Sequence, residues 1–136
     1  MDLQMDLRGG ARAPQAARDA VLGLAGWLPP ETLQDVRLLI SELVTNSVRH
    51  GGARRGRRVL LRLSASDRVV RVEVSDRGPG FDLVQPRPSP DHRSGWGLVL
   101  VDRIADRWGV QRGDLSSVWF EIDRGDTFRH RARISA

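Results

Sequence analysis

The sequence predicts an α/β protein in which helices pack on one face of a mixed, mostly antiparallel sheet, as a two-layer sandwich. Residues 35–52 repeat apolar side chains at the spacing of an amphipathic helix. Residues 59–63 and 70–74 alternate apolar and polar side chains, as half-buried strands do. Because each helix and each strand then has one apolar face, the two kinds of element can bury those faces against each other.

The composition is that of a single globular domain. The chain has 136 residues, of which 40% are apolar and 29% charged, so it can bury a core of ordinary size. It contains no cysteine, which excludes disulfides and thiolate chemistry. No apolar run is long enough to span a membrane, and the N-terminus does not resemble a signal peptide. We therefore expect a cytoplasmic protein with one domain over residues 1–123 and a flexible tail over residues 124–136.

The positive charge is carried by arginine alone. The net charge is +5, and all 22 basic residues are arginine. The absence of lysine excludes a P-loop, whose lysine contacts phosphate. The densest basic run, residues 54–58, has no aromatic side chains within it, so a solvated loop is expected there rather than a nucleic-acid site.

The first half of the chain predicts one strand and two helices. Residues 1–10 contain a short alternating piece that suits an edge strand. Pro14 suits the first turn of a helix that continues to about Leu28, where two prolines interrupt it. The helix of residues 35–52 follows, with Glu31 in its first turn.

The second half predicts two hairpins with a helix between them. Ser66-Asp67 link the first two strands, and a tight turn and a proline-rich loop over residues 82–94 follow. A helix over residues 98–106 leads to a second hairpin that turns at Gly113-Asp114. Trp108, Trp119 and Phe120 in this hairpin are expected in the core.

Two polar residues lie on the flank of the apolar stripe of the helix of residues 35–52. Glu42 and Asn46 are four residues apart and therefore lie on the same side of the helix. By itself this pair fits either a functional site or a polar boundary between helix and solvent.

A carboxylate is predicted at the buried face of a strand. Asp76 follows Val74 by two residues, so it shares the face of the valines. A buried carboxylate is costly unless it has a partner. The turn after it contains Gly78 and Gly80, which permit close backbone approach. Two more glycines, Gly95 and Gly97, open the next helix, where backbone N–H groups can bind an anion.

Three motifs therefore follow one another: the Glu42–Asn46 pair on a helix, Asp76 with glycines after a strand, and the two glycines that open the next helix. Together, in this order, they resemble the motifs of a known family. The chain resembles the GHKL (Bergerat-fold) ATP-binding superfamily, and within it the small anti-sigma-factor serine/threonine kinases of bacteria. SELVTNSVRHG is similar to the family's N box, VEVSDRGPGF to its G1 box, SGWGLVLVDRIADRWGV to its G2 box and SSVWFEI to its last strand. The resemblance covers roughly residues 14–122.

The resemblance implies a role for each matching residue. Asn46 would bind Mg²⁺ through its amide oxygen, and Glu42 would act as the base toward the attacking hydroxyl. Asp76 would accept a hydrogen bond from the amino group of adenine, which favours ATP over GTP. The other expected nucleotide contacts are Gly78, Gly80, Gly95, Gly97, Leu98 and Ser117. Arg18 and Arg93 are both candidates for a phosphate contact.

The implied function is an ATP-dependent anti-sigma-factor kinase that phosphorylates an anti-anti-sigma (STAS) protein and sequesters a sigma factor. The alternative is a binding module that holds ATP and a partner without phosphotransfer. A histidine kinase catalytic domain would need a dimerisation helix, and a gyrase-like or MutL-like ATPase a transducer domain, for which the chain leaves no room. A homodimer is possible in this family, whereas contact with nucleic acid or membrane is not expected.

Overall fold

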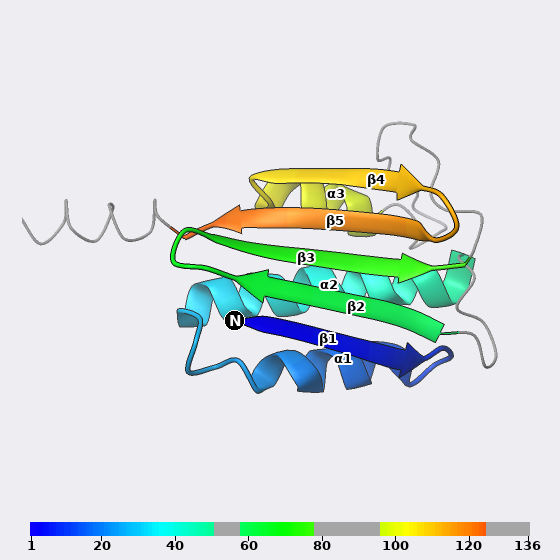
Figure 1. The fold of residues 1–136 in the computed structure, drawn as a ribbon, viewed down its shortest axis with the longest axis horizontal. Helices are drawn as coiled ribbons and strands as arrows, with labels where there is room; N and C mark the ends of the chain where they lie inside the picture. The colour runs from blue at the N-terminus through cyan, green and yellow to red at the C-terminus, as the bar shows by residue number, and fades with distance from the viewer. Residues whose placement is uncertain (51–57, 78–95, 125–136) are drawn as a thin grey trace, which may run out of the picture.

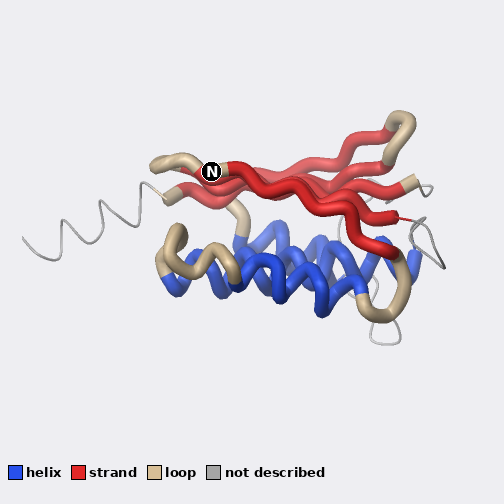
Figure 2. The backbone as a smooth tube through the Cα atoms, turned by 60° about the horizontal axis from the view of Figure 1, so that its bottom comes forward, coloured by secondary structure: helices blue, strands red, loops and turns tan. Residues whose placement is uncertain are grey.

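The computed structural model describes residues 1–50, 58–77 and 96–124. Within these ranges the chain forms two layers, with the sheet on one side and the helices on the other (Figure 1 and Figure 2). The elements are, in chain order, β1 (Asp2–Arg8), α1 (Ala13–Leu22), α2 (Pro30–His50), β2 (Arg58–Ala65), β3 (Val69–Asp76), α3 (Trp96–Ile104), β4 (Arg107–Arg112) and β5 (Ser116–Asp123).

The sheet has the strand order β1-β2-β3-β5-β4, and every neighbouring pair is antiparallel. The prediction of a mixed sheet is therefore wrong for the described strands, although the two-layer α/β fold is confirmed. The reason lies in the last hairpin. β3 and β4 run in the same direction and are joined across α3, but β5 turns back and lies between them (Figure 1).

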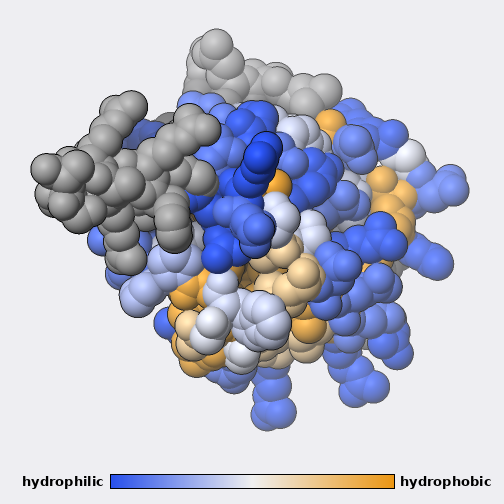
Figure 3. All heavy atoms as spheres, turned by 60° about the vertical axis from the view of Figure 1, so that its left-hand side comes forward, coloured by the Kyte–Doolittle hydropathy of each residue, from blue (hydrophilic) through white to orange (hydrophobic). Residues whose placement is uncertain are grey.

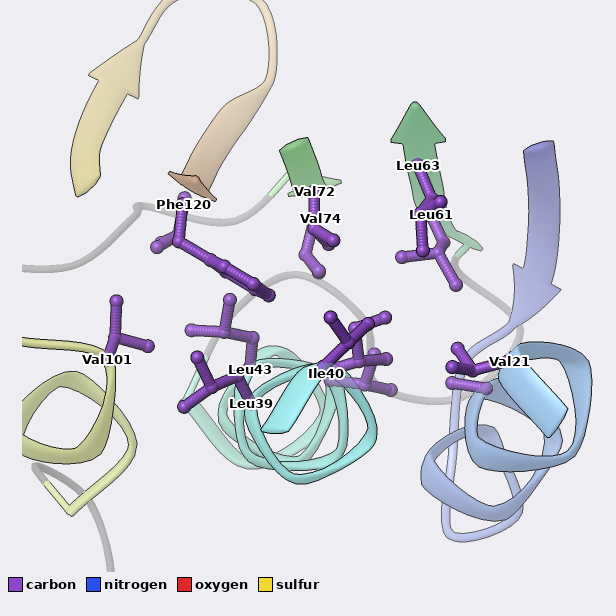
Figure 4. Close-up of a cluster of buried hydrophobic side chains, with 14 of the residues drawn as sticks. Val21, Leu39, Ile40, Leu43, Leu61, Leu63, Val72, Val74, Val101 and Phe120 are labelled. Carbon is purple, nitrogen blue, oxygen red and sulfur yellow. The ribbon is translucent and has the colours of Figure 1, made fainter. Parts of the chain in front are cut away.

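α2 is the centre of the helical layer. Its apolar stripe faces the sheet, and its members Val36, Leu39, Ile40, Leu43 and Val44 are fully buried. Figure 4 shows Leu39, Ile40 and Leu43 directed at Val72, Val74 and Phe120 of the sheet. The helix also packs between α1 and α3. Burial of a side chain of this size contributes about 1.5–3 kcal/mol, so this stripe accounts for much of the stability of the fold.

The first helix is shorter than the sequence predicts. α1 ends at Leu22, whereas the apolar pattern continues to Leu28. Turns replace the last part of the predicted helix, and Gly23 donates its backbone N–H to Ala20, three residues back. Leu24 and Leu28 remain buried in this connection. The apolar spacing thus predicts which residues enter the core, and the glycine content of the segment explains why it does not continue as a helix.

The two faces of the sheet differ. The inner face packs on the helices and carries Val70, Val72, Val74, Val118, Phe120 and Ile122, which are all buried. The outer face carries Arg71, Glu73, Ser75, Ser117, Trp119 and Glu121. The expectation that Trp119 belongs to the core is therefore wrong: its ring lies on the outer face, against Gly109 and 4.3 Å below the Arg71 guanidinium. Phe120 is in the core, and Trp108 packs against it.

None of the helices in the described part of the chain is long and apolar enough to cross a membrane.

Candidate functional site

The C-terminal half of α2 carries the first two predicted site residues. Glu42 and Asn46 lie one helical turn apart and share one side of the helix. Asn46 is buried, with 3% of its surface exposed, and Glu42 is half-buried. Ser47, the next residue, is also buried. The C-terminal end of this amphipathic helix therefore places several polar side chains inside the protein.

Asp76 is the last residue of β3, and it lies on the inner face as the strand alternation predicts. Only 4% of it is exposed. Across the sheet it is paired in register with Ser116, the first residue of β5, which is also buried. A carboxylate and a hydroxyl thus lie side by side on the inner face, at the end of the two central strands.

Ser117 does not lie with these residues. It is paired in register with Ser75, and its hydroxyl is 2.8 Å from the Ser75 hydroxyl on the outer face. The structure therefore places Ser116, and not the predicted Ser117, beside Asp76. The strand alternation could have shown this, because Ser116 has the same parity as Val118 and Phe120, which point to the core.

The third element of the site is α3. Gly97 belongs to its first turn, and Leu98, at the next position, is buried in the core with 6% exposed. The remaining predicted residues, Gly78, Gly80, Gly95 and Arg93, lie outside the described residues.

Arg18 on α1 reaches α2. One of its guanidinium nitrogens donates to the hydroxyl of Ser41, at 2.6 Å, and the other donates to the side-chain oxygen of Gln15, also at 2.6 Å. Ser41 directly precedes Glu42. Of the two arginines considered for a phosphate contact, Arg18 is thus held against the middle of α2, next to the helical turn that carries Glu42.

The elements that carry Glu42, Asn46, Asp76 and Ser116 lie at the same end of the sandwich. The end of β3, the start of β5, the start of α3 and the C-terminal half of α2 lie on the same side of the molecule (Figure 1). The groups collected there are two carboxylates, an amide and a hydroxyl, which is a set of oxygen ligands and hydrogen-bonding groups that suits a nucleotide with a hard cation. A carboxylate on the inner face of a strand can accept a hydrogen bond from a flat ligand inserted between the layers.

A cluster of charged side chains lies on the outer face of the sheet. Hydrogen bonds from Arg107 hold the pKa values of Glu121 and Asp123 below their usual range. Arg107 Nε is 2.8 Å from Glu121 and its Nη2 is 2.5 Å from Asp123. Arg107 is half-exposed and the two carboxylates are partly exposed to solvent, so this cluster is an ion-pair network on the surface rather than a reactive site.

Comparison with known proteins connects this geometry to a family. Residues 11–121 match the model of the histidine kinase-like ATPase domain. The anti-sigma F factor of Clostridium acetobutylicum is 31% identical over 104 residues, which are 70% of this chain and 73% of that protein. The anti-sigma F factor of Pasteuria penetrans is 28% identical over 120 residues, or 80% of each chain.

Solved structures agree on the fold. The histidine kinase domain of the blue-light activated histidine kinase EL346 from Erythrobacter litoralis is similar with a TM-score of 0.59 and 25% identity. This chain spans 60% of the length of that domain structure, and 84% of this chain is covered. The nucleotide-free catalytic domain of histidine kinase ThkA has a TM-score of 0.55 at 14% identity, with 90% of this chain and 96% of that chain covered.

Proposed function

Because the chain belongs to the histidine kinase-like ATPase domain family, we propose that it is an ATP-dependent protein serine/threonine kinase. In this proposal it phosphorylates an anti-anti-sigma protein of the STAS type and sequesters a sigma factor. The observation that carries the proposal is the placement of Glu42 and Asn46 on one side of α2, at the end of the sandwich where Asp76 is buried. The relatives named anti-sigma F factor support the assignment of partners.

The inner end of the sheet binds the base. Asp76 accepts a hydrogen bond from the exocyclic amino group of adenine, and guanine, which has a carbonyl oxygen there, is disfavoured. Ser116, its register partner, offers a hydroxyl that can donate or accept next to it. Leu98 lies in the apolar cluster between α3 and the sheet and can contact the flat face of the base. These three residues are buried in the fold, and in this proposal they also contact the base.

The C-terminal, polar end of α2 binds the phosphates. Asn46 presents an amide oxygen, which is the kind of ligand that Mg²⁺ accepts alongside phosphate oxygens. A Mg²⁺ ion held there would supply positive charge that offsets the charge of the phosphates. Arg18 lies against the same helix and is a candidate for a contact with the terminal phosphate, provided that it leaves Ser41.

Glu42 is the proposed base. It is half-buried on the side of α2 that also holds Asn46, so its carboxylate can orient the serine hydroxyl of a partner and accept its proton. Loss of such a group lowers a rate by about 10²–10⁴-fold. A binding module without transfer would have no need for a carboxylate at this position, and the alternative function is decided by the same test.

The test is phosphorylation of a STAS partner that demonstrably binds the chain, with labelled ATP, by wild type and by Glu42→Gln. The expected result is phosphoserine with the wild type and a rate about 10²–10⁴-fold lower with the variant under single-turnover conditions. ATP affinity, measured by titration calorimetry, should be unchanged or slightly higher, because a negative charge near the phosphates is removed.

The matched control is Glu73→Gln, a half-buried glutamate on the outer face of β3. It should transfer phosphate at the wild-type rate. Equal rates for wild type and Glu42→Gln would refute Glu42 as the base. Absence of transfer by the wild type to a partner that binds would establish the non-catalytic alternative.

A further inference from the structure

One part of the helical layer exposes large apolar side chains. Leu22 at the end of α1, Trp27 in the α1–α2 connection and Leu38 on the outer side of α2 are 45%, 64% and 41% exposed. We call these three residues the α1–α2 surface. Figure 3 brings this end of the molecule forward and shows orange and pale residues gathered on one part of it among blue ones. Exposed apolar groups of this size, when they gather on one side of a small protein, indicate a contact site.

The same part of α2 carries an unfavourable pair of negative charges. Glu31 and Asp35 are four residues apart and therefore neighbours on the helix surface, where like charges repel. Burial and the nearby Glu31 raise the pKa of Asp35 above its usual value. Neither carboxylate forms an ion pair with any of residues 1–50, 58–77 or 96–124. A cation supplied from elsewhere would relieve this repulsion.

The last described residue of the chain contacts the α1–α2 connection. Arg124, the last described residue, donates from Nη2 to the backbone oxygen of Trp27 at 3.1 Å and from Nη1 to the backbone oxygen of Ser66 at 2.5 Å. Its backbone N–H donates to Arg68 at 2.7 Å. The Arg124 side chain therefore contacts the backbone of Trp27, three residues before α2 starts, while the Arg124 backbone is held at Arg68 in the turn between β2 and β3.

The sequence that follows has the complementary chemistry. Residues 125–136 contain Phe128, Ile134 and the cations Arg129, Arg131 and Arg133. An extended chain covers about 3.3–3.6 Å per residue, so Phe128 can reach roughly 13 Å from Arg124. Leu38 lies about 12 Å along α2 from Pro30, since a helix rises 1.5 Å per residue. The twelve residues 125–136 could extend over roughly 40 Å, which exceeds the rise of α2 from Pro30 to Leu38, so the segment is long enough to pass Glu31 and Asp35.

We propose that residues 125–136 dock on the α1–α2 surface of the same chain, with Phe128 against Trp27 and Leu38 and the arginines against Glu31 and Asp35. The sequence predicts a flexible tail here, because Phe128 and Ile134 alone bury little. The described residues favour docking because they provide an anchored start, an exposed apolar surface and a negative pair without a cation. Covered in this way, α2 would have its outer side closed near its N-terminus.

The test uses the full chain without nucleotide, so its outcome is independent of the proposed kinase function. Since the protein has no cysteine, Ala132→Cys provides a unique position for a nitroxide label. The label broadens nearby amide signals in NMR spectra. The expected result is stronger broadening at Leu22 and Leu38 than at Asp67, although Asp67 lies in the turn whose neighbouring residues Arg124 contacts and is therefore close to the anchor.

Two variants show whether the broadening comes from the proposed contacts. Phe128→Ser, and separately Glu31→Gln combined with Asp35→Asn, should return Leu22 and Leu38 to the level of Asp67. Equal broadening at all three sites in the unsubstituted chain would mean that the segment samples space freely, which overturns the proposal. Broadening in a mixture of labelled and unlabelled chains, observed on the unlabelled chain, would also overturn it, because the segment would then dock on a second copy.

Discussion

The inner and outer faces of the sheet differ in the exposure and pairing of their polar side chains. On the outer face, partly exposed charged residues form ion pairs: Arg107 contacts Glu121 and Asp123, and Arg71 contacts Glu121. On the inner face, polar residues are buried at one end only, next to an apolar core that fills the rest. Exposed pairs cost little and contribute little.

The difference shows which polar residues the fold needs and which it tolerates. Val72 and Val74 precede Asp76 on the same face, and another apolar residue would extend that core. A buried carboxylate there costs free energy that its own hydrogen bonds only offset, so stability does not explain its presence. The contact with adenine that we propose for Asp76 would explain it. Substitutions on the two faces should therefore differ in their effects on stability and on ATP binding.

The largest effect is expected in the core. Phe120→Ala leaves a cavity between β5 and α2 and should lower the free energy of unfolding by about 3–5 kcal/mol. Its neighbour Trp119→Ala, on the outer face, should cost only about 1–2 kcal/mol because that ring is partly exposed in the folded protein. Urea unfolding of both variants measures the difference. If Trp119→Ala is the more damaging of the two, the assignment of the two faces is wrong.

The second effect concerns the base site. Asp76→Ala removes the acceptor proposed for the adenine amino group, and a hydrogen bond to a charged group contributes about 1.5–3 kcal/mol. ATP affinity should fall roughly ten- to a hundredfold. Titration calorimetry gives the affinity, and circular dichroism confirms the fold. Glu73→Ala, on the outer face of the same strand, serves as the control and should bind ATP normally; unchanged affinity in Asp76→Ala would remove it from the site.

A smaller effect distinguishes two adjacent serines. Ser116→Ala should weaken ATP binding several-fold, by about 1 kcal/mol, because its hydroxyl lies beside Asp76. Ser117→Ala should leave ATP binding unchanged and lower stability slightly, because the Ser75 hydroxyl loses its partner. Calorimetry and thermal unfolding of both variants are sufficient. The opposite pattern would restore Ser117 as the residue at the base and contradict the strand register.

The smallest effect is expected in the surface network. The folded-state pKa values of Glu121 and Asp123 are lowered by Arg107, so the stability they contribute is present above about pH 4 and is lost as the pH falls through the lowered values. Arg107→Gln should lower the melting temperature at pH 7 by at most about 3 °C. The two proteins should converge once the pH is low enough to protonate both carboxyls in the folded protein.

Arg62→Gln is the control for this measurement, since Arg62 is an exposed arginine on the outer face of β2. It should follow the wild type at every pH. A difference between Arg107→Gln and the wild type that persists unchanged down to pH 2 would mean that packing of the Arg107 stem, and not its charge, stabilises the sheet.

Residue spacing was sufficient to predict the elements and most of the core. The apolar stripe of α2, the two hairpins and the inward position of Asp76 follow from periods of 3.6 and 2, which depend on local backbone geometry alone. Glu42 and Asn46 share one side of α2 for the same reason. The turn at Gly23 was missed because apolar spacing reports burial and does not report where helical hydrogen bonding stops.

The sequence by itself therefore predicted most of the buried side chains and the face of each element on which they lie. It also predicted a set of polar residues in the order found in a nucleotide-binding family. Only the tertiary structure decided which strands are neighbours. The insertion of β5 between β3 and β4 makes the sheet antiparallel and pairs Asp76 with Ser116 and Ser75 with Ser117. Pairing across strands is a long-range choice between alternatives that satisfy the same local pattern, and it is settled by how the whole core packs.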